Sequence, residues 1–224
     1  MPVGDVVALT LANICLDVQI SICMYLHPSD ILTLRKVCRH HKFSLLKSVK
    51  YIIKTCKALQ PSTRQRVVWV AALHRVCLDN TLFLPSFPIS DMSDLDIEKA
   101  AMGPRRWIEF CVAFEKQHLN DPGAVLSPRS TRIINDSFAT EVDYGDTLFF
   151  IVPGGRYLVS FSSKDISVLD LGYTSSANCK LIASVGLDGG YTRQNIWNQF
   201  RVQTTPDGMG LVIFSSNAYV RLYI

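Results

Sequence analysis

The chain of 224 residues is 48% hydrophobic and 19% charged with a net charge of +4, a composition that excludes a chain disordered along its whole length. Its seven cysteines are scattered and form no C-x-x-C pair, which argues against a disulfide framework and against the common zinc-site spacings. We therefore expect reduced, buried thiols in an intracellular protein.

The most apolar early stretch, residues 6–16, lies between Asp5 and Asp17 and is about half of the roughly 20 residues that a membrane span needs. No basic residue precedes it and no small-residue cleavage pattern follows it, so a secretory signal is not expected either. The sequence predicts a cytoplasmic or nuclear protein with no membrane partner.

Residues 31–78 contain eleven Lys or Arg and no Asp or Glu. A nucleic-acid-binding face gathers such cations on one surface, with aromatic residues or a recognised motif among them. Here the cations are spread around every helical angle, so we expect no nucleic-acid partner and keep a basic nucleic-acid module as a third alternative. They include Arg35, Lys36, Arg39, Lys42, Lys47, Lys50, Lys54 and Lys57.

Helical signals dominate before about residue 120, and a linker at 119–131 separates them from strand and turn signals. Pro28 and Asp30 suit the first turn of one helix, where a missing N–H costs nothing and an acid meets the positive end of the dipole. Ser62 and Gln65 predict a capping box in front of the clearest helix of the chain.

Residues 81–88 (T-L-F-L-P-S-F-P) follow as an extended apolar segment, which we expect to pack on the helices. Ser93 predicts the start of a short helix that ends at Gly103, and Pro104 opens the next helix. That helix carries Trp107, Phe110, Cys111 and Phe114 on one stripe, which we expect to be core.

After the linker, strand-like runs alternate with turns, and the pattern recurs. Residues 153–163 (P-G-G-R-Y-L-V-S-F-S-S) match 206–216 (P-D-G-M-G-L-V-I-F-S-S) at an offset of 53, and eight of the nineteen positions 153–171 are identical to their partners at 206–224. Such a repeat is typical of propeller blades, and two similar hairpins in an unrelated sandwich are the alternative. Closed propellers need roughly four to eight blades, so we expect a partial propeller that is truncated or completed by another chain.

The usual catalytic constellations are missing: G-x-S-x-G, H-E-x-x-H, the P-loop motif and a G-x-G-x-x-G after a strand do not occur. His74 and Cys77 share one helix but sit in an apolar stripe, and His40-His41 point to different sides of a helix without a third ligand. We expect a non-catalytic protein with no cofactor and no metal.

Residues 16–36 (L-D-V-Q-I-S-I-C-M-Y-L-H-P-S-D-I-L-T-L-R-K) resemble the opening of the F-box of fungal proteins, with Ile14-Cys15 in place of the usual Leu-Pro. Periodicity alone leaves this segment open, because Val18 and Ile22 fit a helix stripe while Leu16, Val18 and Ile20 alternate as in a strand. The resemblance implies a helix and a substrate-receptor subunit of an SCF-type ubiquitin ligase. Its partners would be a Skp-family adaptor, which is acidic, and an unknown ubiquitination target. The docking residues it implies are Leu16, Val18, Ile20, Ile22, Leu26, Pro28, Ile31, Leu32 and Leu34.

The F-box pattern continues twice after residue 36, at 37–39 (V-C-R) and again at 55–59 (T-C-K-A-L), and only the second leads at the family's distance to R-Q-R-V-V-W (64–69). Without residues 37–54 the sequence reads as one uninterrupted F-box. We therefore hypothesise that these residues are a retained intron, with a genuine helical insertion as the equal alternative.

The predicted fold class is α+β. An all-helical F-box occupies 10–78, with 37–54 as its candidate insert, and a helical connector occupies 79–118 before the linker at 119–131. Antiparallel β blades of a partial β-propeller, about two in number, occupy 132–224. The alternative function is a propeller-type protein-interaction module without a ubiquitin role, its helices serving only as a cap.

Overall fold

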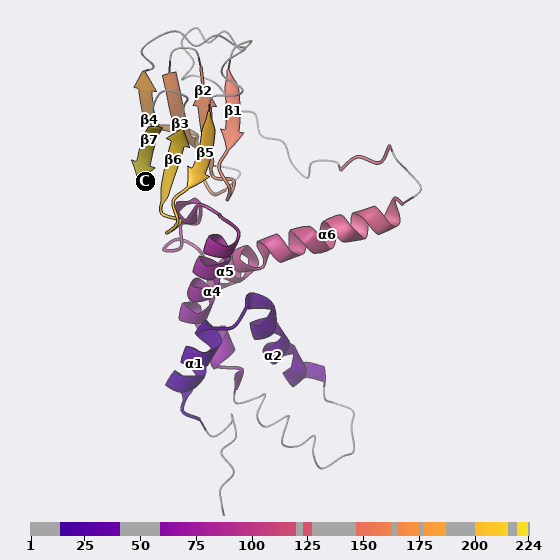
Figure 1. The fold of residues 1–224 in the computed structure, drawn as a ribbon. Helices are drawn as coiled ribbons and strands as arrows, with labels where there is room; N and C mark the ends of the chain where they lie inside the picture. The colour runs from indigo at the N-terminus through magenta and orange to yellow at the C-terminus, as the bar shows by residue number, and fades with distance from the viewer. Residues whose placement is uncertain are drawn as a thin grey trace, which may run out of the picture. The chain divides into compact units, whose positions relative to one another are not determined.

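A computed structural model describes residues 14–40, 59–119, 123–126, 147–162, 165–174, 177–186, 200–214 and 219–223 (Figure 1). They form helices and antiparallel sheets, so the predicted α+β class is confirmed. The chain divides into two compact units. One, the helical unit, comprises Met1–Val76 and Met92–Val112, and the other, the sheet unit, comprises Cys77–Asp91 and Ala113–Ile224.

The described helices are α1 (Leu16–Met24), α2 (Pro28–His40), η2 (Ser62–Arg64), α4 (Arg66–Asp79), η3 (Leu84–Ser86), α5 (Asp94–Ala101) and α6 (Gly103–Gln117). Within the described ranges, no helix is long and apolar enough to cross a membrane. The core of the helical unit is built mainly on α4, whose Val68, Trp69 and Leu73 are at most 1% exposed.

Local signals fixed most helix starts. Pro28 opens α2 as predicted, and the hydroxyl of Ser93 accepts a hydrogen bond from the backbone N–H of Asp96 at the start of α5. The capping box at Ser62 is wrong. The Ser62 hydroxyl instead donates to the carbonyl of Leu59 inside a 3₁₀ turn, so α4 begins only at Arg66.

Helix α4 ends in a Schellman-type turn. The backbone N–H of Leu82 donates to the carbonyl of Cys77 and that of Thr81 donates to the carbonyl of Leu78, the paired bonds of this motif. Thr81 occupies the left-handed position with φ +51°, where glycine is usual and a β-branched residue is rare. The turn directs the chain into the sheet unit.

The sheet unit contains two antiparallel sheets in which sequential strands are neighbours. Sheet A has the order β1 (Leu148–Ile151), β2 (Tyr157–Phe161), β3 (Asp165–Asp170) and β4 (Lys180–Gly186). Sheet B has the order β5 (Arg201–Thr204), β6 (Gly210–Phe214) and β7 (Tyr219–Tyr223).

The sequence repeat is a structural repeat. The offset of 53 carries β1 onto β5 and β2 onto β6, and it preserves the register: Leu148 pairs with Phe161 as Arg201 pairs with Phe214. The hairpin turns match as well, because Gly155 and Gly208 occupy the same position with φ +78° and +71°. Strand alternation and turn chemistry, both local, thus produce the same meander twice.

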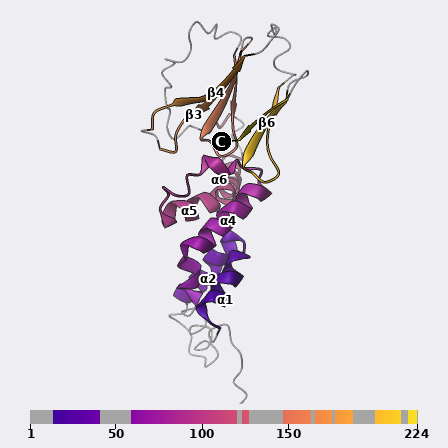
Figure 2. The ribbon, with the colours of Figure 1, turned by 90° about the vertical axis from the view of Figure 1, so that its left-hand side faces the viewer.

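The two sheets share one hydrophobic core, and Figure 2 shows them as separate layers. Sheet A contributes Val159 and Phe161, sheet B contributes Leu211 and Ile213, and the rings of Phe161 and Phe200 lie 4.7 Å apart. We call this side of sheet A its inner face.

The repeat reveals how the sheets are stacked. At the offset of 53, Leu211 of sheet B corresponds to Leu158 of sheet A, which lies one residue from Val159 and therefore on the opposite side of its sheet. The face that sheet B presents to sheet A therefore corresponds, in the repeat, to the side of sheet A that faces away from sheet B. The two sheets stack in the same orientation, so that unlike faces are in contact.

Phe83 belongs to this sheet core, so the prediction that residues 81–88 pack on the helices is wrong for this residue. Phe83 is fully buried in the core with its ring 5.5 Å from that of Tyr157. Its N–H donates to the carbonyl of Pro153, and that of Leu84 donates to the carbonyl of Gly208. The segment bonds to the equivalent turns of both sheets, which is a long-range pairing that no local pattern specifies.

The predicted core stripe on α6 is also wrong. Trp107 is 59% and Phe110 is 49% exposed, while Cys111 and Phe114 are half-buried, and α6 has no buried residue. Helical spacing places these side chains on one stripe, but spacing does not determine that another element covers the stripe.

Candidate protein-docking surface on the first helix

Helix α1 is anchored by the side that carries Gln19 and Cys23. Gln19 and Cys23, one turn apart, are 4% and 1% exposed. The amide of Gln19 donates to the carbonyl of Ile14, and the sulfur of Cys23 lies 3.9 Å from the hydroxyl of Ser62. Burial raises the pKa of the Cys23 thiol, although Ser62 opposes the effect. The contact between Cys23 and Ser62 holds α1 against η2, and the bond between Gln19 and Ile14 stabilises the start of α1.

The exposed side of α1 carries apolar side chains beside the polar Asp17 and Ser21. Val18, Ile22 and Tyr25 follow each other at spacings of four and three residues, and they are 45%, 39% and 82% exposed. Leu16 is 44% exposed at the first residue of the helix, but its spacing of seven residues from Cys23 places it on the side of Cys23. We call Val18, Ile22 and Tyr25 the α1 stripe. Exposed apolar side chains gathered on one element are typical of a surface that binds another protein.

The other predicted docking residues divide into two groups. Ile20, Leu26, Leu32 and Leu34 are half-buried. Pro28 and Ile31 are buried, Ile31 completely, because α2 turns this side toward the core, so these two residues cannot contact a partner. Tyr25 was missed by sequence reasoning, although the helical spacing from Val18 and Ile22 could have found it.

The two parts of the predicted F-box meet around one arginine. Arg35, in α2, donates to the carbonyl of Thr63 at 2.6 Å and forms an ion pair with Glu98 at 2.7 Å. Its guanidinium lies 5.3 Å from the centre of the Trp69 ring, and the Trp69 indole donates to the same Thr63 carbonyl. Residues on both sides of the candidate insert therefore share one small core. Of the candidate insert, residues 41–54 lie outside the described residues.

Several cations of the basic segment are engaged inside the helical unit. Besides Arg35, Arg66 donates to the carbonyl of Met92 and to Asp94, and Arg75 donates to the carbonyls at the end of α1, those of Met24 and Leu26. These arginines stabilise the arrangement of α1, α2 and α4. They explain part of the lopsided charge without an external anion.

The thiol and imidazole considered for catalysis differ in exposure. Cys77 is buried, and burial raises its pKa to about 12, so the thiol stays protonated at neutral pH, whereas His74 is exposed. Among the residues that the structure describes, no group of three or more His, Cys, Asp or Glu could hold a metal ion.

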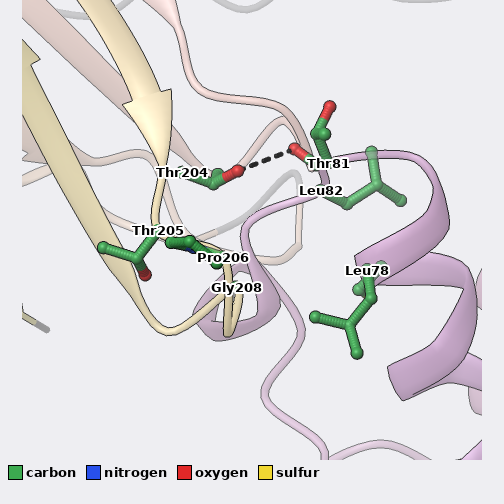
Figure 3. A pocket seen from close by; sticks show the side chains of 8 residues that line it. Leu78, Thr81, Leu82, Thr204, Thr205, Pro206 and Gly208 are labelled. Carbon is green, nitrogen blue, oxygen red and sulfur yellow. Dashed lines mark hydrogen bonds between the residues drawn. The ribbon is translucent and has the colours of Figure 1, made fainter.

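A small cavity lies where the turn after α4 meets the β5–β6 turn (Figure 3). Its volume of about 140 Å³ is below the roughly 300 Å³ of a typical ligand site. Leu78 and Leu82 line one side, Pro206 and Gly208 the other, and the Thr204 hydroxyl donates to the carbonyl of Thr81 at 3.3 Å. The cavity is a gap between two packed turns of the sheet unit, and its volume is too small for an organic ligand.

Comparison with known proteins gives no further guidance, since no protein-family model, no curated protein and no solved structure matches the chain.

Proposed function

We propose that this protein is a non-catalytic F-box-type receptor, which docks to a Skp-family adaptor through the α1 stripe and presents a ubiquitination target on propeller-like β blades. The observation that carries the proposal is the exposure of apolar side chains on α1. The helix buries Gln19 and Cys23 and exposes Val18, Ile22 and Tyr25 alongside Asp17 and Ser21, so three large apolar side chains of a short helix remain available to a partner.

The grouping around Arg35 supports the same proposal. The resemblance to the F-box divides into residues 14–36 and 55–73, and Arg35, Thr63 and Trp69 link these two parts directly. A docking module of this kind needs α1 held firmly at its back so that its outer side stays available. Arg75 contributes to this by binding the carbonyls that end α1.

The stacking of the sheets supports the blade part of the proposal. Blades of a propeller follow one another the same way up, so each contributes opposite faces to its two neighbours. A sandwich of two similar hairpins related by a two-fold axis would instead bring like faces together. Sheets A and B follow the first pattern, since Leu211 and Leu158, which correspond in the repeat, lie on different sides of the interface.

Adaptor docking is testable by capture of the full chain on an immobilised Skp-family protein. Val18→Asp and Ile22→Asp place a carboxylate on the α1 stripe, and each should weaken binding by about 30-fold or more because the charge must be desolvated in the interface. Leu95→Asp is the matched control, since Leu95 is 58% exposed on α5 of the same unit, outside the α1 stripe. It should bind like wild type.

A variant that lacks residues 37–54 tests whether this segment is an insert. If that segment is an insert, the deletion variant folds and binds the adaptor at least as well as the full chain. Failure of wild type to bind, or equal binding by Val18→Asp, Ile22→Asp and wild type, would refute the docking proposal. The β blades would then favour the alternative, a protein-interaction module without a ubiquitin role.

A further inference from the structure

Sheet A carries an apolar surface on the side that faces away from sheet B. The strand register places Ile151, Leu158, Leu169 and Leu181 in one row across the four strands, with Phe149 on the same side of β1. The middle of this surface is buried, since Leu158 and Leu169 are 8% and 9% exposed. Its ends are open, since Phe149, Ile151 and Leu181 are 52%, 62% and 44% exposed. We call it the outer face of sheet A.

The 53-residue repeat shows which surface of sheet B corresponds to the outer face of sheet A. At the offset of 53, Phe149 corresponds to Val202 and Leu158 corresponds to Leu211. Leu211 is fully buried against the inner face of sheet A, and Val202 packs at the edge of the same core. The outer face of sheet A is therefore the copy of a surface that is already buried once inside the chain.

The complement of that surface also exists in a second copy. The inner face of sheet A contains Val159 and Phe161, whose counterparts are Val212 and Phe214 on the side of sheet B that faces away from sheet A. We call this side the far face of sheet B. Val212 is 9% and Phe214 is 41% exposed there. Each molecule thus offers one half of the interface at each end of its two-sheet stack.

The charges on the two faces are opposite. Asp165 lies on the outer face of sheet A, where its carboxylate accepts hydrogen bonds from Ser167 and Ser184. Arg201 lies on the far face of sheet B, paired across the strands with Phe214, and its side chain is exposed. An acidic group at one end and a basic group at the other favour contact between unlike faces.

We infer that copies of this chain assemble head to tail, the outer face of sheet A in one copy packing on the far face of sheet B in the next. Such heterologous contacts close into rings when the rotation per copy allows it. Because propellers have roughly four to eight blades, a ring of two-blade chains would contain roughly two to four copies. The inference rests on the blade part of the proposed function and is independent of adaptor docking.

The test is the solution mass of the full chain by light scattering, with one substitution on each face. Wild type should give a small multiple of 25.1 kDa. Ile151→Lys spoils the outer face and Phe214→Lys spoils the far face, so each variant alone should be monomeric, its association weakened by about 30-fold or more. An equimolar mixture should form a capped 1:1 dimer, since it contains one intact face of each kind. Met209→Lys, at a 44% exposed turn position between β5 and β6, is the matched control and should assemble like wild type.

A monomeric wild type would overturn the inference. So would assembly lost in Ile151→Lys but kept in Phe214→Lys, because that result indicates contact between two outer faces. If the variants fail to fold, hydrogen exchange of wild type decides the question: amides of β1 and β6 should become slower to exchange as the concentration rises, and concentration-independent rates would count against assembly. Adaptor capture by Ile151→Lys should equal that of wild type, which separates this test from the docking proposal.

Discussion

Arg35 is expected to be the residue whose loss most weakens the link between the two parts of the helical unit. Its guanidinium binds Glu98 and the Thr63 carbonyl and lies over Trp69, and the two charged side chains are only 16% and 22% exposed. In Arg35→Ala all three contacts disappear, and Glu98 is left largely enclosed without its partner.

The magnitude follows from these contacts. Charge-assisted hydrogen bonds contribute about 1.5–3 kcal/mol each, and a partly buried cation–π contact contributes about 1 kcal/mol. The residual exposure reduces the sum, so we expect Arg35→Ala to lower the free energy of unfolding of the helical unit by about 3 kcal/mol. Arg35→Lys keeps the charge but cannot span both acceptors and stack on Trp69, and should lose about 1–2 kcal/mol.

Native-state hydrogen exchange of the full chain measures this effect, because amides of α2 and α4 report the helical unit separately from the sheets. Lys36→Ala, the exposed neighbour in α2, should change the free energy by no more than about 0.5 kcal/mol. A double-mutant cycle with Glu98→Gln should give a coupling of about 1 kcal/mol or more. A loss below about 1 kcal/mol in Arg35→Ala would show that the two parts are held together by other contacts.

Two further outcomes are expected in the sheet unit. Thr81→Gly should raise the free energy of unfolding by about 0.5–1 kcal/mol, because glycine fits the left-handed position while the backbone bonds of the turn remain, and a decrease in urea unfolding would contradict this. The ion pair with Arg156 lowers the pKa of Asp170, so the pair stabilises the fold above the unfolded-state pKa of about 4, and this contribution is lost as pH falls through the folded value. The difference in unfolding free energy between wild type and Asp170→Asn should therefore be constant from neutral pH to about 4 and shrink below it; a constant difference at lower pH would contradict the assignment.

The sheet repeat could be predicted closely from the sequence because its determinants are local. Alternating apolar residues specify the strands, and P-G-G and P-D-G specify turns in which Gly155 and Gly208 adopt positive φ. Which faces of the sheets meet was not predictable, since alternation only assigns side chains to two sides. The offset of 53, applied to the observed core, was needed to show that the sheets stack the same way up.

The errors occurred where a local signal competes with a tertiary contact. Serine is a residue type that favours helix N-caps, but the Ser62 hydroxyl donates to the preceding carbonyl of Leu59 and lies against the sulfur of Cys23. Phe83 was expected to pack on the helices as part of an extended apolar segment, yet its N–H binds the carbonyl of Pro153 and its ring joins the sheet core. Each outcome depends on a partner distant in sequence or on a competing bond that spacing does not reveal.

Helix α1 is the element for which the combination of sequence and structure matters most. Its sequence fits both periods, because apolar residues alternate with Asp17, Gln19 and Ser21 as in a strand while Val18 and Ile22 also fit a helix stripe. The structure resolves this in favour of a helix that turns Gln19 and Cys23 inward. Burying the amide requires a dedicated hydrogen bond to Ile14, whereas burying Val18 or Ile22 would require none. The adaptor docking that we propose would use this orientation, because it leaves Val18 and Ile22 accessible.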